Sequence, residues 1–369
     1  MAASVETYPE IREGVVKLCA RFSGSHWRAL DREMAYPTEF VNALTASGWL
    51  SILIPEEYGG SGLPLSAAAA VLEEMQRAGC NSGACHAQMY TMGTLLRYGS
   101  DAQKRLYLPQ IASGALRLQA FGVTGPSSGT DTGAMKTTAV LQGDSYVVNG
   151  QKVWTSRAEH SDLMRLLART KPLRDGKKKT EGLSVLLVDM RQALGNGLTI
   201  RPIRTMMNHA TTEVFFDNLR VQAENLIGEE GKGFRYILSG MNAQRILIAA
   251  ECLGDAKWFT EKSTAYAKDR QVFGRAIGQN RGVQFPVARA YVNMRAAELM
   301  VREALRLYEA GETPVPGRIW PRCSLPTPVL RPQMSVSRPT AASVLPRSTM
   351  WSASSAKPGC IRSPRSQPT

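Results

Sequence analysis

Residues 116–156 read LRLQAFGVTGPSSGTDTGAMKTTAVLQGDSYVVNGQKVWTS, a pattern that is typical of short β-strands joined by turns. The turn residues include Gly143-Asp144 and Asn149-Gly150, both of which favour hairpins. Runs of alternating or β-branched residues recur at 118–124, 136–141, 145–148, 183–189, 198–203 and 213–221. The sequence therefore predicts a small antiparallel β-domain over residues 116–225.

On both sides of this β-domain the apolar periodicity is helical. Upstream, amphipathic stretches separated by Gly and Pro predict an N-terminal helical domain over residues 1–115; they lie at 9–22, 37–47, 65–78 and 101–111. Downstream, residues 235–269 and 283–310 predict two long antiparallel helices, whose apolar faces a four-helix bundle would cover. The predicted fold class is α+β, with a partial C-terminal bundle over residues 226–312.

The charge of the chain is concentrated in its last segment. The net charge is +14, but residues 313–369 hold seven arginines, one lysine and no acidic residue, so residues 1–312 carry about +6. Eleven of the 20 prolines also lie in the last segment. We expect residues 313–369 to be irregular or disordered, because a helix cannot propagate through that proline density. The remaining charge suits a protein that binds polyphosphate ligands, and we predict no nucleic-acid partner.

Metal and membrane roles have little support in the sequence. The six cysteines are scattered without the spacing of a zinc site, and the four histidines form no pair at i+3 or i+4, so we expect reduced thiols and no metal. No apolar run is long enough to span a membrane, and the polar first residues do not resemble a signal peptide. A cytoplasmic location is the expectation.

Four motifs in order along the chain resemble those of the acyl-CoA dehydrogenases, which share the predicted domain order. Residues 123–131, VTGPSSGTD, resemble the family's V-T-E-P-x-A-G-S-D, and residues 149–156, NGQKVWTS, resemble N-G-x-K-x-W-I-T. The segments NLIG with GKGF at 225–234 and RQVFG at 270–274 resemble the linker into the bundle and the R-x-x-F-G turn. The resemblance implies a flavoprotein that uses FAD to desaturate an acyl-CoA thioester.

The resemblance also implies roles for individual residues. Trp154 is expected to flank the isoalloxazine ring, and Ser156 is expected near N5, where a hydride arrives. Five further residues are expected to line the flavin and thioester region: Phe121, Val123, Thr124, Gly129 and Thr130. Residues expected at the thioester substrate are Thr130, Met241, Asn242 and Arg245.

The second half of the nucleotide is expected to lie against another subunit. Arg270 and Phe273 match positions that hold the pyrophosphate and adenine, with Arg281 and Gln284 beside them. A homodimer or homotetramer is therefore implied. An electron-transfer flavoprotein or a similar acceptor is the implied redox partner.

Of the two positions at which the family carries its catalytic base, the chain retains one, and no carboxylate occupies it. Family members carry this carboxylate either in a C-terminal loop or on the first long helix directly before an arginine; here Gln244 precedes Arg245, and an amide cannot accept the proton. Glu251, two turns further on the same helix, is an alternative base, although a structural ion pair is the more common role for such a residue.

The C-terminal segment suggests a change of reading frame. If residues 317–369 are back-translated with suitable codons and the DNA is read one base earlier, the resulting amino-acid sequence is similar to the end of an acyl-CoA dehydrogenase. We infer a frameshift near Thr313, which would remove the last bundle helices and leave apolar faces of residues 235–310 exposed.

Three functions follow as hypotheses. The first is an acyl-CoA dehydrogenase impaired by Gln244 and by the altered end of the chain. The second is a catalytically inactive flavin-binding relic of the same fold. The third, which the sequence favours least, is a protein whose basic tail binds nucleic acid or an anionic membrane.

Overall fold

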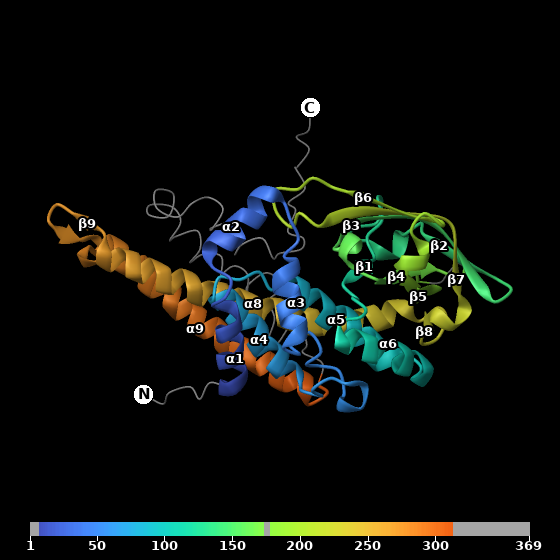
Figure 1. Ribbon diagram of the computed structural model, residues 1–369, viewed down its shortest axis with the longest axis horizontal. Coiled ribbons are helices and arrows are strands. Elements are labelled where there is room, and N and C mark those ends of the chain that lie inside the picture. The colour runs from blue at the N-terminus through green and yellow to red at the C-terminus, as the bar shows by residue number, and fades with distance from the viewer. Residues whose placement is uncertain (1–6, 173–177, 313–369) are drawn as a thin grey trace.

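The computed structural model describes residues 7–172 and 178–312 (Figure 1). A helical layer comes first in the chain, a β-sheet domain lies at one end of the molecule, and a long helical hairpin extends toward the other end. Within these residues, no helix is both long enough and apolar enough to cross a membrane. The predictions for residues 313–369 fall outside the described part of the chain.

The N-terminal layer is built around one alanine-rich helix. Its helices are α1 (Pro9–Cys19), α2 (Gly24–Glu33), α3 (Thr38–Ala46), α4 (Leu65–Arg77), α5 (Gly83–Tyr98) and α6 (Asp101–Ser113). Residues 67–70 of α4 are four fully buried alanines, whose small side chains let α1 and α8 pack closely on α4. A capping box between Ser100 and Gln103 starts α6, since each side chain accepts from the other's backbone N–H.

The sheet domain holds strands at the predicted positions, and two of its strand pairings are parallel, which the sequence did not predict. Its strands are β1 (Ala120–Gly122), β2 (Thr138–Gln142), β3 (Ser145–Ser156), β4 (Leu163–Arg169), β5 (Leu183–Asp189), β6 (Leu198–Pro202), β7 (Thr211–Gln222) and β8 (Leu226–Ile227), with the short helix α7 (Met190–Ala193) after β5. The strand order is β6-β7-β3-β2-β4-β5-β8, and β1 pairs with β4. Most pairs are antiparallel as predicted, but β1 and β2 each meet β4 in parallel.

One predicted turn is correct and the other is wrong. Gly143 and Asp144 form the two-residue turn of the β2–β3 hairpin, where Gln142 pairs with Ser145. Asn149-Gly150 is not a turn, because β3 continues through it to Ser156 with a shift in its pairing with β7. Gly150 has φ 135°, and a Cβ there would lie 2.8 Å from the Thr137 Cα, so this position of the bulge requires glycine.

The two predicted long helices are α8 (Gly233–Asp269) and α9 (Arg281–Glu309), joined by the hairpin of β9 (Gln271–Val272) and β10 (Arg275–Ala276). Their partners come from the N-terminal layer, since α8 packs on α4 and α5 as well as on α9. Gly254 of α8 lies directly against the backbone of α4 at Glu73, where no Cβ would fit. One hydrophobic core therefore combines the N-terminal helices with the long hairpin.

One face of α9 stays exposed among the described residues. Phe285, Val292 and Leu299, spaced seven residues apart on this helix, are 60%, 64% and 71% exposed. Residues at that spacing form a stripe along one side of a helix. The opposite side, which includes Met294, Val301 and Leu305, is buried in the shared core.

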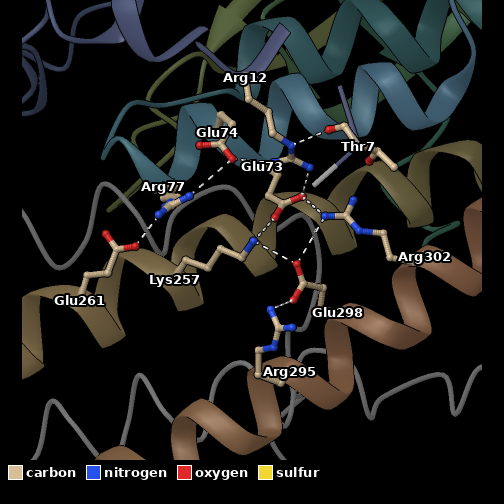
Figure 2. A network of polar contacts seen from close by, with 10 residues as sticks. All are labelled: Thr7, Arg12, Glu73, Glu74, Arg77, Lys257, Glu261, Arg295, Glu298 and Arg302. Carbon is tan, nitrogen blue, oxygen red and sulfur yellow. Dashed lines mark hydrogen bonds and ion pairs between the residues drawn. The ribbon is translucent and has the colours of Figure 1, made fainter. Parts of the chain in front are cut away.

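A buried ionic cluster joins four helices around Glu73 (Figure 2). The Glu73 carboxylate has no exposure and contacts Lys257 at 2.6 Å, Arg302 at 2.8 Å and Arg12 at 3.1 Å. Glu298 of α9 contacts the same Lys257 at 3.0 Å. The surrounding cations lower the pKa of Glu73 to about 2 although burial alone would raise it. The cluster fixes α1, α4, α8 and α9 relative to one another.

Candidate functional site

A buried lysine ties the loop after β1 to strand β3. The Lys152 Nζ donates to the Val123 carbonyl at 2.9 Å, and the Val153 N–H donates to the Thr124 carbonyl at 2.9 Å. Lys152 has no exposure, and this desolvation lowers its pKa to about 7. The structure thus brings together the two motifs at 123–131 and 149–156.

Trp154 leaves the sheet at a second irregularity of β3. The pairing of β3 with β7 shifts between Lys152 and Thr155, and Trp154 in this bulge has φ 59° and is 54% exposed. Two residues later, the Ser156 Oγ accepts from Asn208 Nδ2 at 2.8 Å. The indole therefore offers an uncovered aromatic surface one residue away from the hydrogen bond between Val153 and Thr124.

The two candidate residues near the end of the first motif lie at the surface. Gly129 and Thr130 are exposed, and a Cβ built on Gly129 would meet no atom within 4 Å. Phe121 of β1 is half-buried and points to the helical layer, where the Arg165 guanidinium lies 3.5 Å from its ring centre. The segment from Phe121 to Thr130 therefore runs from the interior to an open edge.

The candidate substrate residues of α8 are half-buried on one helical turn. Met241, Asn242, Gln244 and Arg245 have intermediate exposure, and Arg245 Nη1 donates to Asn242 Oδ1 at 3.0 Å. Gly240, directly before Met241, faces the sheet domain, since a Cβ there would lie 3.6 Å from Arg165 Nη1. The structure thus brings this turn of α8 next to the layer that holds Phe121.

The candidate nucleotide residues lie at the opposite end of the molecule. Arg270, Phe273, Arg281 and Gln284 surround the β9–β10 hairpin, at the far tip of the long helices in Figure 1. Phe273 is 100% exposed and has φ 53°. Gln244 and Arg270 are 26 residues apart on the chain, about 40 Å along a helix. One chain therefore cannot bring the residues around Gln244 and those around Arg270 to the same small molecule.

Two arginines of the sheet domain, one buried and one half-buried, were not identified from the sequence. Arg165 of β4 is 1% exposed, and its Nη1 donates to acceptors on α5 that include the Tyr90 and Thr91 carbonyls. Burial lowers its pKa to about 10. Arg157, directly after β3, is half-buried, and desolvation lowers its pKa as well. Arg165 lies in an otherwise apolar run, and arginines in such runs are the signal that would have marked it.

Glu251 lies in a buried polar cluster. It is 2% exposed, accepts from the Ser82 Oγ, and lies 3.4 Å from His86 Nδ1. Its carboxylate is therefore engaged by α5. Within the described residues, no group of His, Cys, Asp and Glu could hold a metal, and Cys19, Cys80, Cys85 and Cys252 are not joined by disulfides.

These residues fit the flavin that the sequence suggested. A flavin ring is a flat plate with polar edges, so it needs an aromatic or apolar wall and backbone hydrogen-bonding groups. The uncovered indole of Trp154 supplies such a wall, and the segment held by Lys152 supplies backbone groups. Phe273 offers a second uncovered aromatic ring, at the tip of the hairpin.

Family models match three consecutive parts of the chain. They are described as acyl-CoA dehydrogenase N-terminal domain, middle domain and C-terminal domain, and they match residues 6–115, 120–219 and 231–320. Together they cover most of the sequence in the order that the structure shows.

Similar proteins carry related names. The chain is 34% identical over 284 residues to cyclohex-1-ene-1-carbonyl-CoA dehydrogenase of Syntrophus aciditrophicus, covering 76% of this chain and 67% of that protein. It is 32% identical over 313 residues to the probable acyl-CoA dehydrogenase FadE25 of Mycobacterium tuberculosis, covering 83% and 78%. Among solved structures, a glutaryl-coenzyme A dehydrogenase in complex with glutaryl-CoA superposes with a TM-score of 0.81 at 27% identity, covering 94% and 89%.

Proposed function

The chain belongs to the acyl-CoA dehydrogenase family of oxidoreductases acting on CH–CH groups, and from this membership we propose that it binds FAD and an acyl-CoA thioester. In the proposed reaction, an α-proton leaves the thioester while the β-hydrogen is transferred as hydride, which yields a 2-enoyl-CoA. An electron-transfer flavoprotein or a similar carrier is the proposed acceptor of the electrons.

The observation that carries the proposal is the connection between two motifs at β3. Lys152 and Val153 hold the Val123-Thr124 segment beside an uncovered Trp154, and Ser156 follows on the same strand. We assign Trp154 to a face of the ring and Ser156 to its N5 edge. A bound flavin would supply the hydride acceptor.

The substrate is assigned to the turn of α8 that follows Gly240, which lies near Arg165 and hence near Phe121. Met241, Asn242 and Arg245 are half-buried there, and the hydrogen bond between Arg245 and Asn242 orients the guanidinium. Thr130 lies at the open edge of the sheet domain, where a large thioester can enter. Hydrogen bonds to the thioester oxygen would make the α-proton acidic enough to remove.

The proposed enzyme lacks a base at the position on α8. Gln244 cannot accept a proton. Glu251 is buried and engaged by Ser82 and His86, so we do not assign it to proton abstraction. We propose that activity is impaired for this reason. The same observation favours the second function, a catalytically inactive flavin-binding relic.

Two measurements test these proposals. The purified full chain is expected to absorb near 450 nm, roughly where flavins absorb; a colourless protein would contradict the flavin proposal. Gln244→Glu is then expected to raise turnover with an artificial electron acceptor by about a hundredfold or more, since a positioned base contributes about that factor. Gln192→Glu on α7, an exposed position, is the matched control and should leave turnover unchanged. A yellow but inactive Gln244→Glu variant would support the relic instead.

We further propose that a second copy of the chain completes the cofactor site. Arg270, Phe273, Arg281 and Gln284 lie too far from Trp154 to serve the same cofactor within one chain. A homodimer or homotetramer would place them on the nucleotide half of a neighbour's FAD. The basic-tail hypothesis remains the alternative: binding of nucleic acid or anionic vesicles that is lost on deletion after Glu312 would support it.

A further inference from the structure

Lys152 is a buried cation whose charge is not balanced by any carboxylate among the described residues. Its Nζ contacts one oxygen, the Val123 carbonyl at 2.9 Å, and the Met135 Sδ at 3.6 Å. The side chain has no exposure, and no ion pair to it is found within residues 7–172 and 178–312. An ammonium group has three donors, and burying it without a negative partner is costly. Buried charges of this kind concentrate at functional sites.

The second buried cation of the sheet domain has more acceptors. Arg165 Nη1 donates to the Tyr90 and Thr91 carbonyls and to the Thr94 hydroxyl, although its Nε has no partner among the described residues. These three contacts tie β4 to α5. Lys152 has one oxygen acceptor in place of three, so a structural role explains it less well.

The hydrogen bond from Lys152 ends on a peptide of the segment that we assign to the flavin, beside Trp154. This peptide is trans, so the Thr124 N–H points away from the lysine that contacts the Val123 carbonyl. The Thr124 carbonyl accepts from the Val153 N–H, but no acceptor for the Thr124 N–H is found in the part of the chain that the structure describes. A charged donor polarises the carbonyl that it contacts, and linked hydrogen bonds strengthen one another. The Thr124 N–H is therefore a strengthened donor that is available to a ligand.

The proposed reaction creates a negative charge on the group that this segment would hold. A hydride carries two electrons and one hydrogen nucleus, so a neutral flavin that accepts it gains one negative charge, while the α-proton leaves separately as H⁺. A fixed cation about 10 Å away, at an effective dielectric constant of about 20, shifts such an equilibrium about tenfold or more. Desolvation lowers the pKa of Lys152 to about 7, so about half of the molecules carry the charge at pH 7, and a nearby anion raises that fraction.

We propose that Lys152 is a positioning residue for the flavin: its charge acts through the Val123-Thr124 peptide and favours the reduced cofactor over the oxidised one. This inference rests on the proposed function, because it requires a flavin beside Trp154. Lys152 itself touches neither the substrate nor the reacting atoms. A role limited to holding the loop after β1 predicts a different result, since loss of that hold would weaken the binding of both redox forms alike.

The test measures the midpoint potential of flavin bound to the full chain at pH 7, by reduction in the presence of a reference dye. Lys152→Met removes the charge, and Lys152→Gln keeps a neutral donor for the Val123 carbonyl. In both variants the preference for reduced flavin should fall about tenfold, which is about 30 mV for a two-electron couple. Lys136→Met, at an exposed lysine of the sheet domain, is the matched control and should keep the wild-type potential. The measurement needs no turnover, so the amide of Gln244 does not affect it.

Titration with oxidised flavin separates the two roles of Lys152. Weaker binding at an unchanged potential would mean that Lys152 only holds the loop, which would overturn this inference but not the proposed function. If one of the two variants does not fold, the other decides. If neither binds flavin, the unmodified chain decides, because its bound flavin should have a potential above that of free flavin, and a value at or below it would contradict the inference. An unmodified chain that binds no flavin would refute the proposed function itself, and this inference with it.

Discussion

At the scale of single residues, the sheet domain keeps two cations inside without a carboxylate partner among the described residues. Lys152 and Arg165 are both buried, and desolvation lowers the pKa of each. The motif around Lys152 could be recognised from the sequence, and it located the β3 part of the candidate site. The small polar pocket that Arg157 lines could not be recognised, because its other polar residues, which include Asp31, Asn81 and Asn208, are far apart in the chain and carry no local pattern.

Lys152 gives a pH-dependent stability that can be measured. Its pKa is about 7 in the folded chain against 10.5 as the ordinary value, so the unfolded chain binds more protons between these values and stability rises with pH across that window. Wild type should gain at most about 4 kcal/mol between pH 7 and pH 10. Lys152→Met should lose this dependence, as followed by urea unfolding. Lys136→Met, at an exposed lysine, should keep it, and a Lys152→Met variant with the wild-type pH profile would contradict the prediction.

At the scale of elements, the strongest patterns were also the most accurate predictions. The long helices α8 and α9 and strand β5 were predicted within two residues of their observed ends, because their apolar periodicity is regular. Helix α5 was not identified, since buried polar residues such as His86, Thr91 and Thr94 lie among its buried apolar residues and interrupt the amphipathic pattern. Strand β4 was missed because it is buried on both faces and does not alternate.

The ionic cluster makes the packing of four helices sensitive to acid. The folded pKa of Glu73 is about 2, below its ordinary 4.5, so its contribution is complete above pH 4.5 and is lost as the pH falls toward 2. Glu73→Gln should destabilise the chain by about 3–5 kcal/mol at pH 7, because it leaves buried cations uncompensated. Thermal unfolding at pH 7 and pH 4 measures both effects.

Controls for this prediction come from the surface. Glu303→Gln removes one partner of an exposed ion pair with Arg306 and should change the free energy of unfolding by less than about 1 kcal/mol. If Glu73→Gln were as mild as Glu303→Gln, the cluster would not hold the helices together. The sequence gives no sign of this cluster, since Arg12, Glu73, Lys257 and Arg302 lie far apart in the chain.

At the scale of the whole molecule, the candidate residues divide into two groups at opposite ends. The division is a property of the extended hairpin, and it explains why sequence motifs alone could list the candidate residues but could not assign them to one site. The order of the motifs correctly predicted that a helical segment, a sheet segment and a second helical segment follow one another along the chain. Distances between motifs depend on the length of α8, which the sequence predicted closely, and on the direction of this 37-residue helix, which only the structure supplies.

Phe273 tests the proposed sharing of the cofactor between copies. Its ring is fully exposed in one chain, so Phe273→Ala should change the free energy of unfolding by less than about 0.5 kcal/mol. Flavin affinity should nevertheless fall about tenfold, as measured by flavin titration, because the ring would contact the cofactor of a neighbouring copy. Met206→Ala, at another exposed residue, should affect neither quantity. Unchanged flavin affinity in Phe273→Ala would remove the tip of the hairpin from the site.

The part of the long helical hairpin that extends past the ionic cluster would amplify a small change of helix direction at the cluster. Glu261, which contacts Arg77 of α4 at 3.0 Å (Figure 2), is a later anchored charge of α8 than Lys257, and eight residues, about 12 Å of helix, separate it from Asp269. A tilt of about 5° at this point displaces the tip by about 1 Å, which is enough to break or make a hydrogen bond. Substitutions near Glu73 would therefore be felt at Arg270 and Phe273, far from where they are made.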